Sequence, residues 1–263
     1  MKQNYLLKRM LVLALLLAAS FSGSLRAQLS GSYTINPYQS ASGTNYQNWT
    51  SAIGDLLSGS RSDGGSTQGP GISNAVTFTV FDTVYNAVSI DFTAVAGSNP
   101  SRRITFQSAS NNSNRCKLRL ASSSSNTADF VLNLNGADNI TFKGIGFERT
   151  GTAAYATVVQ IGNDANQVKF ENCLFKSKKV PSNSTNGFNY TVGTCLYFYG
   201  NADSTTVLNS RLLYGYNGVY CASTATNNLF SGNTFDTSGS AGIYITGQSN
   251  LVITGNTFNM GDF

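Results

Sequence analysis

Acid–base chemistry in this chain would fall to carboxylates, lysines and arginines, because the sequence contains no histidine. Histidine-based triads, histidine general bases and histidine metal ligands are therefore excluded. A polysaccharide lyase would need a Lys or Arg base beside acidic residues that hold Ca²⁺. The candidate bases are Lys169 and Arg211, and the candidate acids are Asp138, Asp164 and Asp203. These acids are scattered in sequence and Asx turns account for them adequately, so no clustered lyase site is predicted.

Three tyrosines offer binding chemistry instead. Tyr197, Tyr220 and Tyr244 each stand between two apolar residues, at intervals of 23 and 24 residues. In a strand this alternation turns the apolar residues inward and the tyrosine outward. A row of outward aromatic rings could stack on sugar rings, so these tyrosines are the candidate glycan-binding residues. Like residues also stack in repeat proteins for packing alone, and a loop could cover them, so packing remains the alternative.

The sequence has four cysteines, Cys116, Cys173, Cys195 and Cys221, and they lack metal-ligand spacing. When the repeats in the second half of the chain are aligned, Cys195 lies opposite Gly218 rather than opposite Cys221. We therefore predict buried free thiols and no metal site.

The elements that position these residues are repeats in the second half of the chain. Each repeat opens on a turn-favouring residue, mostly alternates apolar and polar residues, and has Gly or Asn three places before a closing Phe or Leu. The five copies are residues 139–147, 167–175, 204–212, 227–235 and 250–258. Their closing residues are 28, 37, 23 and 23 positions apart, a period typical of stacked repeats.

Alternation predicts strands, and a rung of about 23 residues can coil once and pair in parallel with its copy about 4.8 Å away. This predicts a parallel β-helix. Each closing residue, and the residues five and seven positions before it, should point inward. Asn228 is the one poor fit among these positions. The opening residues should stack in sharp corners, where Asn tolerates left-handed backbone.

The same alignment predicts charge pairs on the outward face. Lys143 and Glu171 share one outward position on adjacent rungs, and Glu148 and Lys176 share another. Opposite charges on neighbouring strands are ordinary sheet stabilisers, worth up to about 1 kcal/mol.

One helix is predicted, over residues 46–57, because Trp49, Ile53 and Leu56 fall on one face and Gly59 can end it. Open ends of a β-helix expose unpaired backbone, so we expect this helix to cap the N-terminal end. Short strands of irregular first rungs are expected at 76–80, 90–92, 104–106, 117–120 and 130–134.

The rung pattern resembles the right-handed parallel β-helix superfamily that contains pectate lyases. The first half is similar to a group of secreted bacterial β-helix proteins, on residues 29–35, 76–80, 84–86 and 104–108. The group usually has Gly and an acidic residue flanking the Tyr of the third segment, where this chain has Val84 and Ala87. The resemblance implies the fold and leaves the activity open, because the superfamily includes lyases, hydrolases and non-catalytic surface proteins.

Residues 1–27 have the pattern of a secretory signal peptide: basic residues at the start, an apolar stretch over residues 10–19, and Ala27 before the expected cleavage site. The signal holds four of the 17 basic residues and none of the acidic ones, so the predicted mature chain has a net charge of +1. This balance gives no support for nucleic-acid binding. No later stretch is predicted to span a membrane.

We expect residues 28–263 to form one β-helix domain of a secreted or cell-surface protein that continues beyond Phe263. The leading hypothesis is a non-catalytic structural, adhesive or glycan-binding role without a cofactor. The alternative is a polysaccharide lyase or glycoside hydrolase acting on an acidic polysaccharide, with Ca²⁺ required only under the lyase hypothesis.

Overall fold

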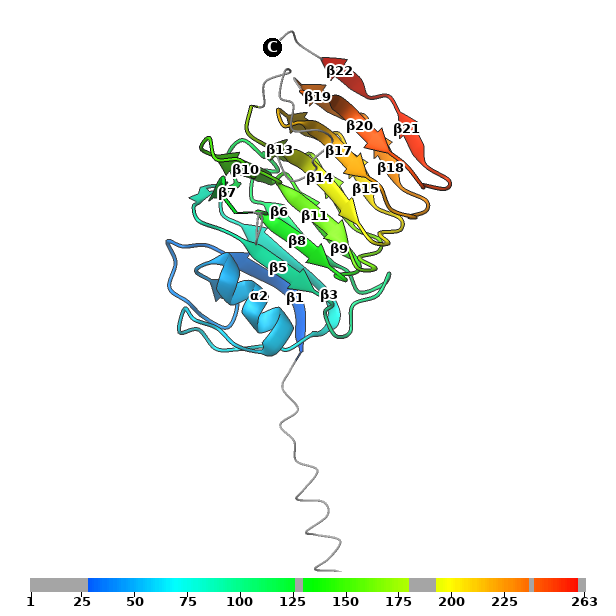
Figure 1. Cartoon of the computed structure of the whole chain (residues 1–263). Coiled ribbons are helices and arrows are strands. Elements are labelled where there is room, and N and C mark those ends of the chain that lie inside the picture. Colours follow the sequence, from blue (N-terminus) through cyan, green and yellow to red (C-terminus); the bar gives the residue numbers. More distant parts are fainter. Residues whose placement is uncertain (1–27, 126–129, 180–192, 237–238, 260–263) are drawn as a thin grey trace, which may run out of the picture.

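The computed structural model describes residues 28–125, 130–179, 193–236 and 239–259, and the predicted signal peptide lies outside them. Among the described residues, the strands form three sheets, here called sheets A, B and C, in which every strand pairing is parallel. From β3 onward, consecutive strands fall in sheets A, B and C in turn, so three strands make one rung, and the rungs climb along one axis (Figure 1). The protein is a right-handed parallel β-helix, as predicted, with the hand that parallel crossovers favour.

The strands of each sheet lie side by side along the axis. In sheet A they are β2 (Asn45–Tyr46), β1 (Leu29–Ile35), β3 (Ile72–Val80), β6 (Ile104–Ser108), β9 (Ile140–Lys143), β12 (Lys169–Glu171), β15 (Thr206–Leu208), β18 (Leu229–Ser231) and β21 (Val252–Thr254). In sheet B they are β4 (Val84–Tyr85), β7 (Lys117–Ala121), β10 (Gly146–Thr150), β13 (Leu174–Lys176), β16 (Arg211–Leu213), β19 (Thr234–Asp236) and β22 (Thr257–Asn259). In sheet C they are β5 (Ile90–Thr93), β8 (Leu132–Asn135), β11 (Val159–Gly162), β14 (Thr194–Tyr199), β17 (Asn217–Cys221) and β20 (Ala241–Ile245). The strands predicted in the first half are all present. β3 starts four residues earlier than predicted, and the ends of the other predicted strands shift by two residues or fewer.

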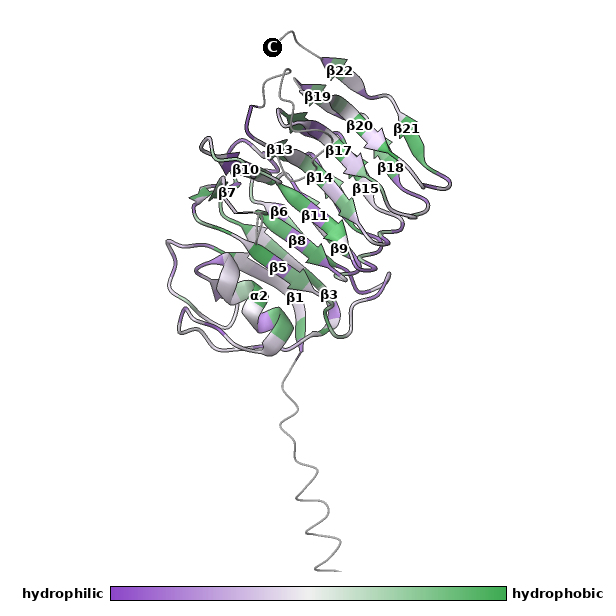
Figure 2. Cartoon of the chain, viewed as in Figure 1, coloured by the Kyte–Doolittle hydropathy of each residue, from purple (hydrophilic) through white to green (hydrophobic). Residues whose placement is uncertain are grey.

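The inward positions predicted from the repeats form the core. In the first four repeats they are 1 % exposed or less: Ile140, Phe142, Phe147, Val168, Phe170, Phe175, Thr205, Val207, Leu212, Asn228, Phe230 and Phe235. In the last repeat Ile253 and Phe258 stay 45 % and 46 % exposed, because no described strand lies over β21 and β22 on their outer side. Figure 2 shows hydrophobic residues along the strands and hydrophilic ones at many of the corners.

Phenylalanines stack in columns inside the coil. In sheet A, Phe78, Phe106, Phe142 and Phe170 follow one another with centroid separations of 4.8, 5.5 and 5.3 Å. In sheet B, Phe147 stacks on Phe175 at 5.7 Å. Each buried ring contributes about 1.5–3 kcal/mol, and each stacked pair adds about 0.5–1.5 kcal/mol. The columns therefore fix the register between rungs.

Asn228, the poor fit among the inward positions, is satisfied by its neighbours. Its Oδ1 accepts a hydrogen bond from the backbone N–H of Thr205 at 2.7 Å, and its Nδ2 donates to Gln248 Oε1 at 2.7 Å. A polar side chain is tolerated there because its hydrogen bonds are made inside the coil.

The predicted helix is α2 (Trp49–Ser58), two residues shorter than expected, and Tyr46 belongs to β2 instead. The Asn48 side chain starts the helix by accepting from the Ser51 N–H, and Gly59 ends it in left-handed backbone. Trp49 is 2 % exposed and stacks on Phe106 at 5.0 Å. The helix caps the N-terminal end of the coil, next to β1 (Figure 1).

Candidate functional site

The tyrosine row lies on the outer face of sheet C. Tyr197, Tyr220 and Tyr244 are direct cross-strand partners on β14, β17 and β20, as the repeat spacing predicted. The neighbouring Leu196 and Val219 point inward and are fully buried, whereas the three tyrosines are half-buried. The shared outward position is thus confirmed, while the binding role remains a prediction.

The ring geometry limits how this row can bind a sugar. Tyr220 and Tyr244 stack nearly parallel, with centroids 5.0 Å apart and planes at 11°, so a sugar ring cannot lie between them. Tyr197 is tilted by 47° against Tyr220 at 6.0 Å. The row therefore offers ring edges and phenol groups along most of its length, and stacking faces only where a ring is tilted or terminal.

The same outward row continues across sheet C into polar residues that the repeat spacing does not predict. Strand register places Asp91, Asn133 and Gln160 in line with Tyr197. Finding these residues from the sequence would need the strand register of the irregular first rungs. The repeat spacing does not extend to those rungs. Together these residues and the three tyrosines form one strip, here called the sheet C strip: Asp91, Asn133, Gln160, Tyr197, Tyr220 and Tyr244.

Tyr199 joins the aromatic and polar parts of the sheet C strip. Its hydroxyl donates to Asn133 Oδ1 at 2.7 Å, and Asn133 Nδ2 donates to Asp91 Oδ1 at 2.9 Å. Its ring lies 5.9 Å from that of Tyr197, at 29°. Burial raises the pKa of Tyr199, so its hydroxyl stays protonated and acts as a donor. Gly162 is the cross-strand partner of Tyr199, and a Cβ there would meet the Tyr199 carbonyl oxygen at 1.8 Å.

The candidate acids build corners. The Asp138 carboxylate accepts from the Asn166 N–H at 2.6 Å, Asn166 Oδ1 accepts from the Asp203 N–H at 2.9 Å, and the Asp203 carboxylate accepts from the Thr226 N–H at 2.6 Å. Each side chain thus binds the backbone of the following rung. Asp164 is exposed in the adjacent turn, with φ of 65°.

The candidate bases are held in ion pairs. Lys169 Nζ lies 2.8 Å from Glu171 Oε2, and Lys143 Nζ lies 3.4 Å from Oε1 of the same carboxylate. The hydrogen bond from Lys169 lowers the pKa of Glu171. Arg211 pairs with Asp236 through its Nε atom. No three Cys, Asp or Glu side chains come together in a group able to hold a metal ion within the described ranges 28–125, 130–179, 193–236 and 239–259.

The four cysteines are unpaired and buried, as predicted. The register of β14 and β17 sets Cys195 opposite Gly218. Burial raises the pKa of Cys173 and Cys195 to about 12, so neither forms a reactive thiolate near neutral pH.

No helix among the described residues has the length and hydrophobicity needed to cross a membrane.

Comparison with known proteins gives few matches. No protein-family model matches the chain, and no curated protein matches it significantly. Two solved structures that match are both of the pectin methylesterase from Aspergillus niger. The deglycosylated form is 14% identical with a TM-score of 0.43, covering 89% of this chain and 87% of its own. The form with one N-acetylglucosamine stub is 13% identical with a TM-score of 0.41, covering 88% and 77%.

Proposed function

We propose that the protein is a secreted or cell-surface β-helix that binds a glycan along the sheet C strip and does not process it. The observation that carries the proposal is the unbroken register of this strip, from Asp91 through Gln160 to Tyr244. The signal-peptide pattern of residues 1–27 supports export.

The chemistry of the sheet C strip suits a sugar chain. The Gln160 amide and the exposed Asp91 carboxylate can exchange hydrogen bonds with hydroxyls, whereas Asn133 is buried and holds Asp91 and Tyr199 in place. Tyrosine rings cover the apolar faces of sugars and add a polar tip. A repeating polymer also fits a protein surface that repeats from strand to strand. Since the facing sides of Tyr220 and Tyr244 cover each other, we assign most of the contact to ring edges and phenol groups.

The test is affinity electrophoresis of the mature chain in gels that contain one polysaccharide each, from a panel of neutral and acidic polymers. We expect at least one polymer to retard the protein, and Tyr220→Ala to weaken that retardation about five-fold or more, which corresponds to about 1 kcal/mol. Tyr220→Phe separates a contact through the hydroxyl from one through the ring. The matched control is Tyr38→Ala, because Tyr38 is 72 % exposed and lies outside the sheet C strip.

Two results would overturn the proposal. Unchanged retardation of Tyr220→Ala on every polymer that binds the wild type removes the sheet C strip from binding. Ultraviolet-absorbing unsaturated products from an acidic polysaccharide, with or without Ca²⁺, would establish a lyase. In that case Lys169→Ala and Arg211→Ala identify the base.

A further inference from the structure

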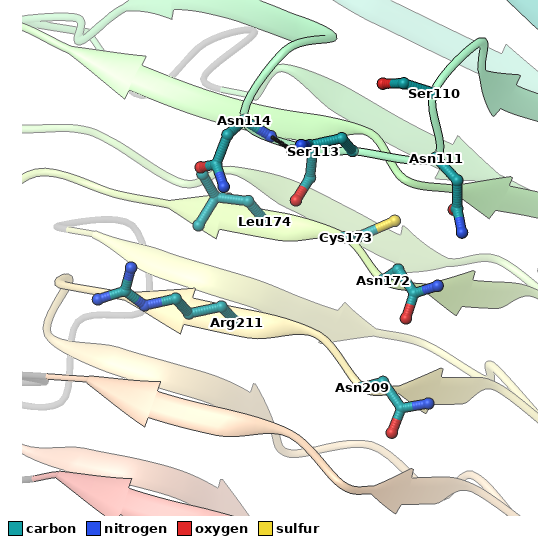
Figure 3. A pocket seen from close by; sticks show the side chains of 10 residues that line it. Ser110, Asn111, Ser113, Asn114, Asn172, Cys173, Leu174, Asn209 and Arg211 are labelled. Carbon is teal, nitrogen blue, oxygen red and sulfur yellow. Dashed lines mark hydrogen bonds between the residues drawn. The ribbon is translucent and has the colours of Figure 1, made fainter.

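A separate cleft lies at the corner between sheets A and B, away from the sheet C strip. The connection from β6 to β7 forms one wall, and two later rungs form the other. The cleft has a volume of about 350 Å³ and is lined by residues 110–114 and 172–174 together with Asn209 and Arg211. Figure 3 shows Asn111, Asn172 and Asn209 along one side, with Asn114, Leu174 and Arg211 across from them.

The wall formed by the connection is held in place by its own contacts and by two glycines beneath it. Asn112 N–H donates to Ser108 Oγ at 3.2 Å, and Ser108 Oγ donates to Asp82 Oδ1 at 2.8 Å. A Cβ on Gly144 would meet the backbone of Asn111 at 2.5 Å, and one on Gly146 would meet the Ser113 carbonyl oxygen at 2.5 Å. The connection therefore rests directly on the next rung, and the cleft is preformed.

The left-handed backbone at the corners of the cleft does not by itself require asparagine. Asn172 and Asn209 have φ of 55° and 48°, a conformation that Asn tolerates. The equivalent corners of the two following rungs use Gly232 and Gly255, with φ of 65° and 61°. Glycine thus serves this corner equally well outside the cleft. Asn172 is half-buried and Asn209 is exposed, and within the described residues neither side-chain amide is tied to another protein group, so their donors and acceptors face the cleft and its solvent.

The charge of the cleft is close to neutral. Arg211 is the one charged residue of its lining, and its guanidinium is paired with Asp236. The two Nη groups of Arg211 make no hydrogen bond to described residues, so they remain available as donors. Leu174 supplies a small apolar surface among the amides.

We propose that this cleft binds a neutral, hydroxyl-rich saccharide unit through Asn172, Asn209 and Arg211. Each amide gives a hydroxyl both a donor and an acceptor, and the volume lies at the small end of ligand sites. This site does not depend on the sheet C strip.

The experiment is ligand-observed saturation-transfer NMR of the mature chain with methyl glycosides of glucose, galactose, mannose and N-acetylglucosamine, and with methyl glucuronoside as the acidic counterpart. We expect at least one neutral glycoside to bind, and the double variant Asn172→Gly/Asn209→Gly to weaken its binding about ten-fold. Glycine keeps the left-handed corner, so the variant removes the amides without straining the backbone. The matched control is Asn250→Gly, an exposed residue with φ of 51° at a corner outside the cleft, which should bind as the wild type does.

The proposals for the sheet C strip and for the cleft can be refuted independently of each other. Tyr220→Ala is expected to leave glycoside binding at the cleft unchanged, whatever its effect on polysaccharide retardation. The cleft proposal is wrong if no neutral glycoside binds the wild type, if the double variant binds as tightly as Asn250→Gly, or if the glucuronoside binds more tightly than every neutral glycoside.

Discussion

Glu148 is a charged residue that faces outward from sheet B and is nonetheless only 1 % exposed. The register predicted Lys176 as its cross-strand partner, and that pairing of positions is confirmed. Its carboxylate, however, contacts the preceding rung, with Lys117 Nζ at 2.9 Å and Arg119 Nε at 2.7 Å. Burial by itself raises the pKa of Glu148, but the contacts with the Lys117 ammonium and the Arg119 guanidinium outweigh it, and the net pKa is lowered.

This lowered pKa makes Glu148 a source of pH-dependent stability. Its contribution is fully present above the unfolded pKa of about 4.3 and is lost as the pH falls through the lower folded pKa. We expect Glu148→Gln to reduce the free energy of unfolding by about 1–3 kcal/mol at pH 7, since it removes a charged, hydrogen-bonded acceptor. The difference from the wild type should shrink as the pH falls below about 4. Urea unfolding of the variant and the wild type at pH 7 and pH 3 measures this difference.

Glu171→Gln is the matched control for that experiment. The Glu171 side chain is 24% exposed, and its ion pairs are partly screened by water, so its loss should cost less than about 1 kcal/mol. An equal loss for Glu148→Gln at pH 7 and pH 3 would contradict the assignment.

Left-handed corners set the length of the sheet A strands in the five repeats. The residues that open the five repeats all have positive φ, from 51° to 59°: Asn139, Gln167, Ser204, Asn227 and Asn250. The Gly or Asn three places before each closing residue also has positive φ: Gly144, Asn172, Asn209, Gly232 and Gly255. These two corners end the strands on both sides, because left-handed backbone cannot continue a strand.

Just after the second corner, a buried ladder joins the rungs. Ser210 Oγ accepts from the Cys173 N–H, Asn233 Oδ1 accepts from the Ser210 N–H, and Asn256 Oδ1 accepts from the Asn233 N–H, at 2.8 to 3.0 Å. Small and amide residues recur at this position because they satisfy backbone groups that the turn leaves outside the sheets.

At the element scale we predict unequal costs for two glycine substitutions at the same corner. Gly144 and Gly232 have φ of 63° and 65°, so alanine costs about 1–2 kcal/mol at both from backbone strain. Gly144→Ala should cost at least about 1 kcal/mol more, because its Cβ would meet the Asn111 backbone, whereas at Gly232 the nearest atom ends the flexible Asn209 side chain. Chemical denaturation compares the two, and equal costs would show that the connection after β6 moves freely.

The whole molecule is a stack in which each rung contacts mainly its neighbours, so its stability depends on how the ends are covered. At the N-terminal end, Trp49 stacks on Phe106 and meets the edge of Tyr85. Tyr46 anchors the cap: its hydroxyl donates to Asp55 at 2.7 Å, and the Arg61 guanidinium lies 4.0 Å above its ring. Arg61 also forms a buried ion pair with Asp63 at 2.9 Å.

Loss of the Trp49 ring should therefore open the coil from its N-terminal end. We expect Trp49→Ala to reduce the free energy of unfolding by about 3–5 kcal/mol. Hydrogen exchange followed by mass spectrometry should show lost protection in β1, β3 and β6 and retained protection in β15 and β16. Trp49→Phe should recover part of the loss. Uniform loss of protection along the chain would mean that the rungs unfold as one unit and that α2 is not a local cap.

The sequence by itself determined the coil, its corners and the outward row of tyrosines. Each follows from a local rule: alternation selects the inward face of a strand, a period of about 23 residues returns the chain to the same sheet, and Asn or Gly supplies left-handed backbone. In-register parallel pairing then makes Tyr197, Tyr220 and Tyr244 neighbours, since residues one period apart must meet.

Only the tertiary structure decided contacts that cross between rungs of unequal length. The polar end of the sheet C strip, at Asp91 and Asn133, belongs to early rungs whose lengths follow no repeat. The cleft exists because the connection after β6 lies across Gly144 and Gly146, and Glu148 reaches back to Lys117 and Arg119 rather than forward to Lys176. Side-chain reach and loop packing set these contacts, and neither has a periodicity that a single sequence displays.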